Sequence, residues 1–189
     1  MNHEGTQHGV GTTYNTYLVN SAFGPAKSTV TGAPTSTGFG FDVFLEFLHN
    51  TSTFFGYGVR AGYAHSAGDD TADFAYGGFP IMVEAAVGTR APGPLDEERK
   101  LIGSISGLAL SLHAGVGYVV AGSLRKAKDS ASTSGYRANL GLRLTLPVTL
   151  VQFTLSAEVA YMASSTVMLA SQDTSFQSTT LLFSNIVAF

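Results

Sequence analysis

The chain has 189 residues, a net charge of −3 and no cysteine. The weak charge and the lack of any lysine/arginine run argue against a nucleic-acid-binding protein, and the lack of cysteine excludes a disulfide framework and a thiolate metal site. Charged residues are only 12% of the chain, whereas about 25% is usual in soluble proteins, and glycine, serine and threonine take their place.

The N-terminal residues 1–9 are polar and lack the apolar core of a secretory signal peptide. We therefore expect the numbering to begin at a mature chain with an added methionine. Residues 1–8 are expected to be a flexible segment of a single domain that spans residues 1–189. No run of about 18 apolar residues occurs, so no transmembrane helix is expected. The first segment, about Val10–Phe23, is expected to be a strand, but its pattern does not assign its two faces.

The next two segments, Gly38–Asn50 and Thr53–His65, alternate with the period of two that is typical of strands. Large apolar residues occupy one face, and glycines and charged residues occupy most of the other. The short link between the segments predicts a hairpin. A register that pairs the apolar residues of the two segments also places Asp42 opposite Arg60.

Alternation continues to the end of the chain and predicts eight strands in total. The later strands are expected at Phe79–Arg90, Gly107–Ala121, Tyr136–Leu146 and Val151–Tyr161, and in a last segment with Leu181, Phe183, Val187 and Phe189 on one face. Gly77, Gly78 and Pro80 predict a bulge before the first of these. Helical periodicity is nearly absent, and only residues 94–100 are expected to form a single helical turn.

The links between the strands alternate in length. The longer, polar links are Phe23–Thr37, His65–Thr71, Gly122–Thr133 and Ser164–Ser175. The links His49–Ser52 and Pro147–Thr149 are short, and Ala91–Lys100 is an exception to the alternation. Long loops at one end and short turns at the other are typical of outer-membrane barrels, and this arrangement would place both termini on the periplasmic side.

In the strands after the first, charged residues fall on the face that carries the small residues. The set consists of Asp42, Glu46, Arg60, Glu84, Arg90, His113, Arg137, Arg143 and Glu158. Because an arginine or lysine at the bilayer midplane costs about 2–4 kcal/mol, a charge-free apolar face is what lipid requires. An eight-stranded barrel is only just wide enough for its inward side chains, so we expect the bulky face outside and the small-residue face inside.

Aromatic residues of the apolar face gather near the strand ends. Phe39, Tyr63, Tyr118, Tyr136 and Tyr161 lie near the longer links, and Phe47, Phe55, Phe153 and Phe189 lie near the shorter ones. Two such belts mark the two interfaces of a membrane. The sequence therefore predicts an all-β protein, an eight-stranded antiparallel up-and-down transmembrane β-barrel.

The chain resembles the small eight-stranded bacterial outer-membrane proteins, the OmpA-, OmpX- and OmpW-type barrels, over nearly its whole length. The most specific feature is the C-terminal segment, where Phe183, Val187 and Phe189 resemble the assembly signal that the barrel-assembly machinery recognises. Asn185 departs from that pattern. The resemblance implies a place in the bacterial outer membrane and contact with the lipid bilayer and lipopolysaccharide. It leaves another envelope protein open as a partner.

The inward charges are expected to pair with one another, because an unpaired buried charge is costly. Asp42 with Arg60 is the best candidate pair, and Arg143 is expected to approach Glu46 or Glu158. The favoured interpretation is that these side chains plug the lumen. A gated ion path is the alternative.

Several functions are compatible with this barrel. We favour a structural or interaction role: anchoring, surface contact or a subunit of an envelope complex. The alternative is a narrow channel or a binding site for small hydrophobic molecules, as the OmpW-type resemblance allows. A soluble ligand-binding barrel would instead stay dissolved without detergent.

Chemical sites are weakly indicated. A single inward His113 is expected to be a hydrogen-bonded filler rather than a base or ligand. A lipid-modifying enzyme ranks last; it would need a serine beside a histidine and an acid, for which His65 and Ser66 with Asp69 and Asp70 are a faint candidate. No metal-ligand spacing or nucleotide motif is present, so no cofactor is expected.

Overall fold

The structure is a computed structural model that describes residues 14–51, 54–69, 72–88, 109–146 and 152–188. Its long strands are β1 (Tyr14–Val30), β2 (Ser36–Asn50), β3 (Phe55–Ala67), β4 (Phe74–Gly88), β5 (Ala109–Lys126), β6 (Asp129–Leu146), β7 (Gln152–Ser164) and β10 (Phe176–Ala188). Two short strands, β8 (Val167–Leu169) and β9 (Gln172–Thr174), pair with each other between β7 and β10. None of the described residues belongs to a helix long and apolar enough to cross a membrane.

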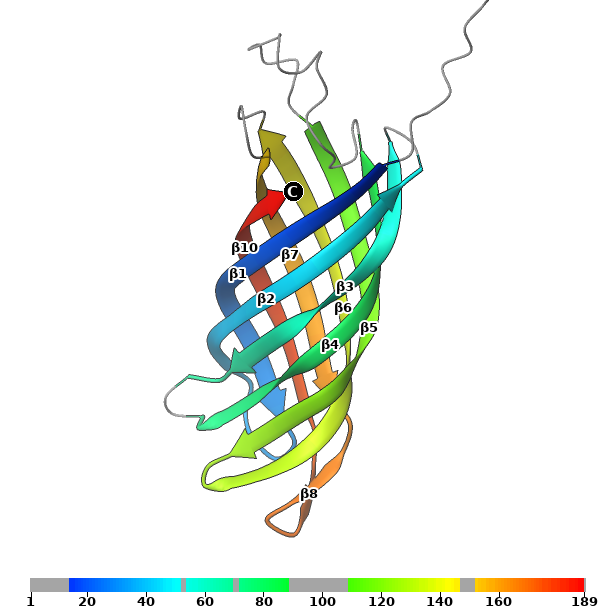
Figure 1. Cartoon of the computed structure of the whole chain (residues 1–189). Helices are drawn as coiled ribbons and strands as arrows, with labels where there is room; N and C mark the ends of the chain where they lie inside the picture. The colour runs from blue at the N-terminus through cyan, green and yellow to red at the C-terminus, as the bar shows by residue number, and fades with distance from the viewer. Residues whose placement is uncertain (1–13, 52–53, 70–71, 89–108, 147–151, 189) are drawn as a thin grey trace, which may run out of the picture.

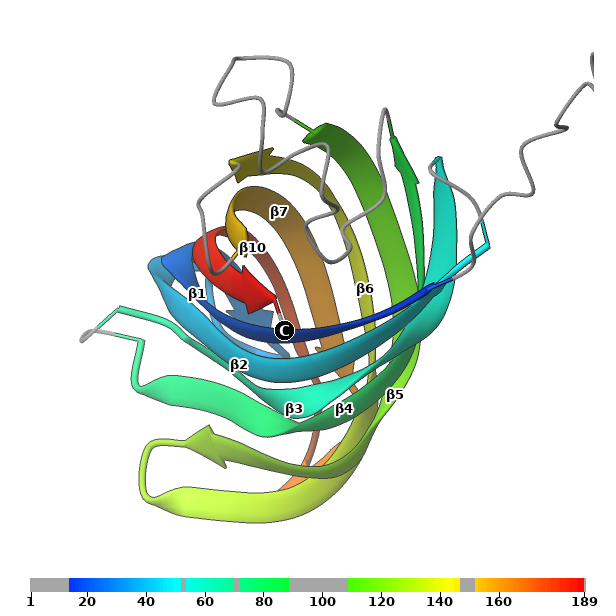
Figure 2. The ribbon, with the colours of Figure 1, turned by 45° about the horizontal axis from the view of Figure 1, so that its top comes forward.

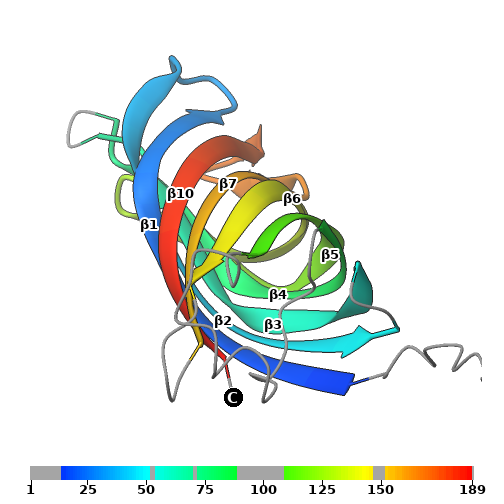
Figure 3. The same cartoon turned by 90° about the horizontal axis from the view of Figure 1, so that it is seen from above.

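The eight long strands form one closed antiparallel barrel in the order β1-β10-β7-β6-β5-β4-β3-β2 (Figure 1, Figure 3). Strands that follow each other along the chain are paired, and β1 closes the barrel against β10, with Val30 opposite Phe176 and Leu18 opposite Ala188 (Figure 2). Closure leaves none of the eight long strands with an unpaired edge that faces solvent or lipid. The expected fold class is confirmed.

β1 is the strand whose faces the sequence pattern did not assign. The structure turns Tyr17, Val19 and Phe23 outward and Leu18 inward. The pattern is ambiguous because Leu18 packs in a small apolar cluster inside the barrel, so both faces of β1 carry apolar residues at this end.

The β2–β3 hairpin has a different register from the expected one. Arg60 lies opposite Glu46, and Asp42 lies opposite Ala64, four residues further along β3. The expected placement of Asp42 opposite Arg60 is therefore wrong. A shift by an even number of residues keeps every side chain on its expected face, because side chains alternate with period two. Alternation thus predicts the faces, whereas the turn sets the register.

Two expected loops are largely strand. The link expected at Phe23–Thr37 shrinks to residues 31–35, and the link expected at Gly122–Thr133 shrinks to Ala127 and Lys128. The period of two continues through these segments, but the outward residues change from apolar to lysine, threonine and serine beyond the aromatic residues. The strands therefore extend beyond the apolar band as hairpins with a polar outer face. The β5–β6 hairpin projects at the end of the barrel opposite the C-terminus (Figure 1).

The expected bulge is present in β4. The pairing of β4 with β5 shifts register between Gly78 and Pro80, and the pairing of β5 with β6 shifts between Val119 and Gly122. Proline has no N–H to donate to a neighbouring strand, so a break in regular pairing accommodates it.

Paired cysteine substitutions test the β2–β3 register, since the chain has no cysteine of its own. In the double variant Leu45→Cys/Ala61→Cys, the two thiols stand on directly opposed outward residues. Such residues have Cα atoms about 4.5–5.5 Å apart, within reach of a disulfide. We expect a lipid-permeable oxidant to remove nearly all free thiol from this variant. The control is Leu45→Cys/Tyr57→Cys, and preferential cross-linking of this second pair would contradict the register.

Candidate functional site

The outer surface of the barrel is apolar along the middle of its strands. Val59, Ile81, Leu112 and Leu142 are each 48–54% exposed to the surroundings. Within the described strands, outward charged residues such as Lys27 and Arg125 lie only toward the hairpin end. An apolar band between two polar ends is the surface that a bilayer requires.

The aromatic residues expected as belts face outward where the structure describes them. Phe39, Tyr63, Tyr118, Tyr136 and Tyr161 lie toward the hairpin end, and Phe47 and Phe55 lie toward the other end. The sequence analysis missed Tyr17 and Phe23, which join these groups from β1: the ring of Tyr17 lies 5.3 Å from that of Phe47 and the ring of Phe23 lies 6.4 Å from that of Phe39. The side chain of Phe153, and Phe189 as a whole, lie outside the described residues.

A cluster of charged side chains fills the middle of the barrel, and Arg60 of β3 is its centre. The Arg60 guanidinium is fully buried and donates a hydrogen bond of 2.8 Å to Glu158 and one of 3.4 Å to Glu84. Its contact with Asp42, the partner expected from the sequence, is longer, at 4.0 Å. Arg60 on β3 therefore contacts acids of β2, β4 and β7, and its hydrogen bonds go across the lumen to β4 and β7.

The other two described arginines of the cluster complete the pairing of the acids. Arg137 donates a hydrogen bond to Asp42 and lies 3.7 Å from Glu158. Arg143 donates two hydrogen bonds of 2.7 Å to the two carboxylate oxygens of Glu46, a bidentate arrangement that is both strong and directional. The sequence left Glu46 and Glu158 open as partners of Arg143, and the structure selects Glu46. Arg90 lies outside the described residues.

His113 of β5 lies among the acids of the same cluster. Its Nδ1 is 3.8 Å from Glu84 and its Nε2 is 3.9 Å from Glu158, and the hydroxyl of Ser156 lies 3.5 Å from Nε2. The amide of Asn139 donates a hydrogen bond of 3.2 Å to Glu84. The histidine thus fills space between carboxylates. No group of three or more metal-ligating side chains was found in the described part of the chain.

Apolar side chains pack on both sides of the charged cluster. Along β4 the inward residues run from Tyr76 and Met82 at the hairpin side, through Glu84, to Ala86 at the side of the termini. The apolar cluster toward the hairpins contains Val30, Phe44, Ala64, Phe74, Tyr76, Met82, Val119, Leu124, Met162 and Phe176. The cluster toward the termini contains Leu18, Leu48, Ala86 and Ile186.

Phe44 joins the apolar and charged layers. Its ring centroid lies 4.0 Å from the guanidinium carbon of Arg60 and 5.4 Å from that of Arg137, which is cation–π geometry. Phe44 shares the inward face of Asp42 and Glu46, as alternation along β2 requires.

The sequence analysis missed Phe74, Tyr76 and Phe176, because it assigned their segments to no strand. Phe74 and Tyr76 lie two residues apart before the bulge, and Phe176 begins the alternation of β10; this spacing was the signal that could have found them.

The structure does not bring together the serine and the histidine of the weakly indicated hydrolase site. His65 and Ser66 are consecutive residues of a strand, so they point to opposite faces of the barrel. Ser66 is buried inside and its hydroxyl lies 3.1 Å from that of Ser28, whereas the ring of His65 packs outside against Phe41. The serine and histidine therefore cannot act together, and Asp70 lies outside the described residues.

No protein-family model matches the sequence, and no curated protein matches it. Solved structures do match. The chain is similar to neisserial surface protein A, with a TM-score of 0.56 and 15% identity over 92% of this chain and 97% of that chain. It is also similar to the outer-membrane protein OprG from Pseudomonas aeruginosa, with a TM-score of 0.50 and 11% identity over 93% of this chain and 95% of that chain. The chain has the fold of the small eight-stranded outer-membrane barrels.

A double-mutant cycle tests the buried pair Arg143 and Glu46. We expect Arg143→Met to destabilise the protein by about 3–5 kcal/mol, because Glu46 is then buried without its partner. The double variant Arg143→Met/Glu46→Gln should recover a large part of that loss, since neither buried charge remains. Urea unfolding in detergent micelles measures both values. Equal destabilisation by the single and double variants would show that the ion pair is not what the substitution breaks.

A second prediction concerns Gly141, whose hydrogen faces the charged cluster. A Cβ atom added there would overlap His113 Nε2 and lie 2.7 Å from the carbonyl oxygen of Ala157. We expect Gly141→Val to lower the free energy of unfolding by about 1–3 kcal/mol through overpacking. The adjacent outward substitution Leu140→Val, measured by the same urea titration, should cost clearly less. If Gly141→Val leaves the free energy of unfolding unchanged, the interior around residue 141 is packed less tightly than these contacts indicate.

Proposed function

We propose that the chain is an integral protein of a bacterial outer membrane, with a closed lumen and a role in structure or contact rather than transport. In this role the barrel anchors itself in the bilayer and offers its outer surface or hairpins to a partner, as an anchor, a surface contact or a subunit of an envelope complex. We assign it no catalytic residue.

The observation that carries the proposal is the burial of Arg60 and Arg143, which have no exposed surface although they lie in the middle of the barrel. Arginines that line a water-filled path would be hydrated. Here the carboxylates of Glu46, Glu84 and Glu158 take the place of water. An eight-stranded barrel has no channel by default, because its side chains fill it. The apolar layers above and below the charges support closure.

The proposed orientation follows from the ends of the barrel. β1 begins and β10 ends at the same end of the molecule, opposite the β1–β2 and β5–β6 hairpins (Figure 1). We place that end in the periplasm and the hairpins outside the cell, next to lipopolysaccharide. Phe183, Val187 and Phe189 would then act as the signal for the barrel-assembly machinery, which acts from the periplasm.

Flux through liposomes tests the closed lumen. We expect vesicles that carry the refolded protein to leak small ions and sugars no faster than protein-free vesicles, because buried ion pairs and apolar layers leave no hydrated path. Vesicles with a general porin are the positive control, and heat-modifiable gel migration verifies folding. Discrete conductance by the folded protein in a planar bilayer would favour the narrow channel instead. Saturable uptake of a small hydrophobic probe would favour the binding site for apolar molecules.

A further inference from the structure

A hollow of about 330 Å³ lies on the outer face of β3, β4 and β5, at the hairpin end of the barrel. Gly77 and Ala75 of β4 form its floor. His65 of β3 lies directly opposite Gly77, and Arg125 of β5 lies directly opposite Ala75. Larger side chains from the two flanking strands therefore stand on either side of a floor that is almost bare.

Polar atoms converge over the glycine of this floor. A Cβ atom added at Gly77 would lie 2.5 Å from the hydroxyl oxygen of Tyr63 and 2.9 Å from Nδ1 of His65. Ser123 of β5 lies opposite Gly77 on the other side. Over the ranges that the structure describes, the side chains of Tyr63, His65 and Ser123 make no hydrogen bond. Each of them has an O–H or N–H group that can donate to a ligand.

Arg125 supplies the positive charge of the hollow, and none of the lining residues is acidic. Its ion pair with Asp73 is 3.5 Å long, and both side chains are more than half exposed, at 60% and 57%. An exposed ion pair contributes little to stability, so the guanidinium can exchange this carboxylate for another anion. A guanidinium also matches two oxygens of a phosphate at once. The chemistry of the hollow thus favours an anionic ligand such as phosphate.

The position of the hollow favours a lipid as the carrier of that anion. The ring of Tyr63 packs 5.2 Å from that of Phe79, and beyond Phe79 the outward residues Ile81 and Val83 of β4 are 54% and 61% exposed. The hollow therefore lies at the border of the apolar band, on the side wall of the barrel. A phosphorylated lipid places its phosphate at this border and its acyl chains against the band.

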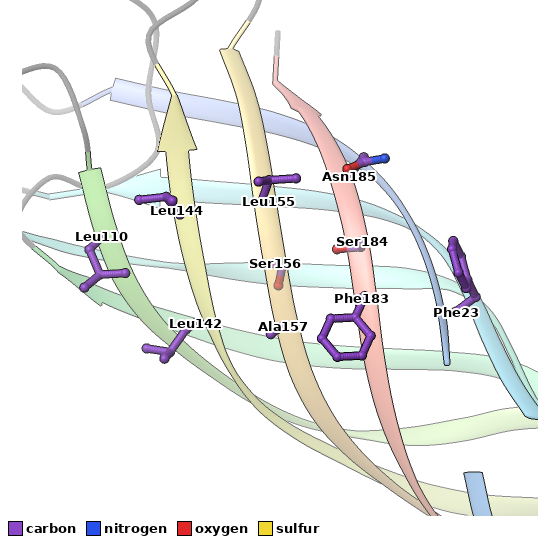
Figure 4. Close-up of a pocket in the computed structure, with 10 residues that line it drawn as sticks. All are labelled: Phe23, Leu110, Leu142, Leu144, Leu155, Ser156, Ala157, Phe183, Ser184 and Asn185. Atoms are coloured by element: carbon purple, nitrogen blue, oxygen red, sulfur yellow. The ribbon is translucent and has the colours of Figure 1, made fainter. Parts of the chain in front are cut away.

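A second hollow on the outer surface differs in chemistry. It has a volume of about 410 Å³ and lies beside Ala157 of β7 (Figure 4). Its lining includes four leucines and two phenylalanines but no charged side chain. Acyl chains can fill such a hollow, but a phosphate would find no cation there. Of the two hollows, the one over Gly77 is therefore the one suited to a charged headgroup.

We infer that the hollow over Gly77 binds the phosphate of an anionic lipid headgroup. This inference rests on the proposed place of the chain in a membrane. Arg125 contacts the phosphate oxygens, and Tyr63 and His65 donate hydrogen bonds from the other side. The acyl chains extend along the apolar outer residues of β3 and β4. The barrel then holds one lipid at a defined place on its circumference.

The chain contains no tryptophan, so a single introduced tryptophan reports on the lipid beside it. Phe79→Trp places the reporter next to Tyr63, and Tyr161→Trp is the matched control, an outward aromatic residue at the same end on β7. The refolded variants are placed in phosphatidylcholine vesicles with increasing fractions of phosphatidic acid, and one lipid carries brominated acyl chains that quench tryptophan. We expect phosphatidic acid to bind roughly threefold to tenfold more tightly than phosphatidylcholine at Phe79→Trp. At Tyr161→Trp we expect no preference.

Substitutions on the Phe79→Trp background separate the charge of the hollow from its shape. Arg125→Gln should abolish the preference, because it removes the cation. Gly77→Ala should weaken the preference at unchanged charge, because the added methyl group takes up space over the floor. Asp73→Asn should strengthen it by removing the carboxylate that competes for Arg125, and asparagine tolerates the φ of 42° at this residue. Lys27→Gln removes an exposed cation at the same end on β1 and, as the control, should change nothing.

Equal preference at the two reporters overturns the inference, and so does an unchanged preference in Arg125→Gln or in Gly77→Ala. Inorganic phosphate, added at constant ionic strength, should leave the preference unchanged. Its loss would assign the hollow to free phosphate and overturn the lipid. Heat-modifiable gel migration verifies that each variant is folded. The result does not depend on whether the lumen conducts, so this test and the flux test fail separately.

Discussion

The interior of the barrel holds buried charge, and most of the inner face is arranged around that constraint. Arg60 is central to this arrangement, because its guanidinium contacts carboxylates from three other strands. A pair confined to neighbouring strands would fix one hairpin only, whereas these contacts tie the wall together across the lumen. Hydrogen bonds of good geometry offset part of the cost of burying the ions, as in the bidentate contact of Arg143 with Glu46.

The outer face must instead present apolar side chains, and the same strands satisfy both requirements. Alternation lets a strand present leucine, valine or phenylalanine to lipid while it presents charged or other polar side chains to the lumen. Beyond the aromatic residues, the outer face turns polar but the inner face stays apolar, as Phe74 and Phe176 show with their rings 6.2 Å apart. The hairpins therefore resemble a small soluble β-structure built on a membrane barrel. Their core is continuous with the barrel interior through Phe44.

The face of each residue could be predicted from the sequence, but its neighbour across the lumen could not. Alternation assigned Asp42, Arg60 and Glu84 to the interior because it depends only on whether positions differ by an even number. The partners depend on register, tilt and closure, which no local pattern encodes. Asp42 thus keeps a contact of 4.0 Å with Arg60, but its hydrogen bond comes from Arg137, which is distant in sequence. Residues such as Tyr76 were missed for another reason: the glycines and the proline that follow predicted a bulge, and no strand was assigned before Phe79.

Asn185 departs both from the apolar outer surface and from the C-terminal assembly pattern. It weakens the resemblance of the C-terminal strand to an assembly signal, and it places an amide where the rest of the surface excludes polar groups. The interior of the barrel shows how such a mismatch is resolved: every carboxylate of the charged cluster has a partner from another strand. On the outer face, Asn185 lies directly opposite Ser21 of β1, so both polar side chains of the mismatch fall on one cross-strand pair.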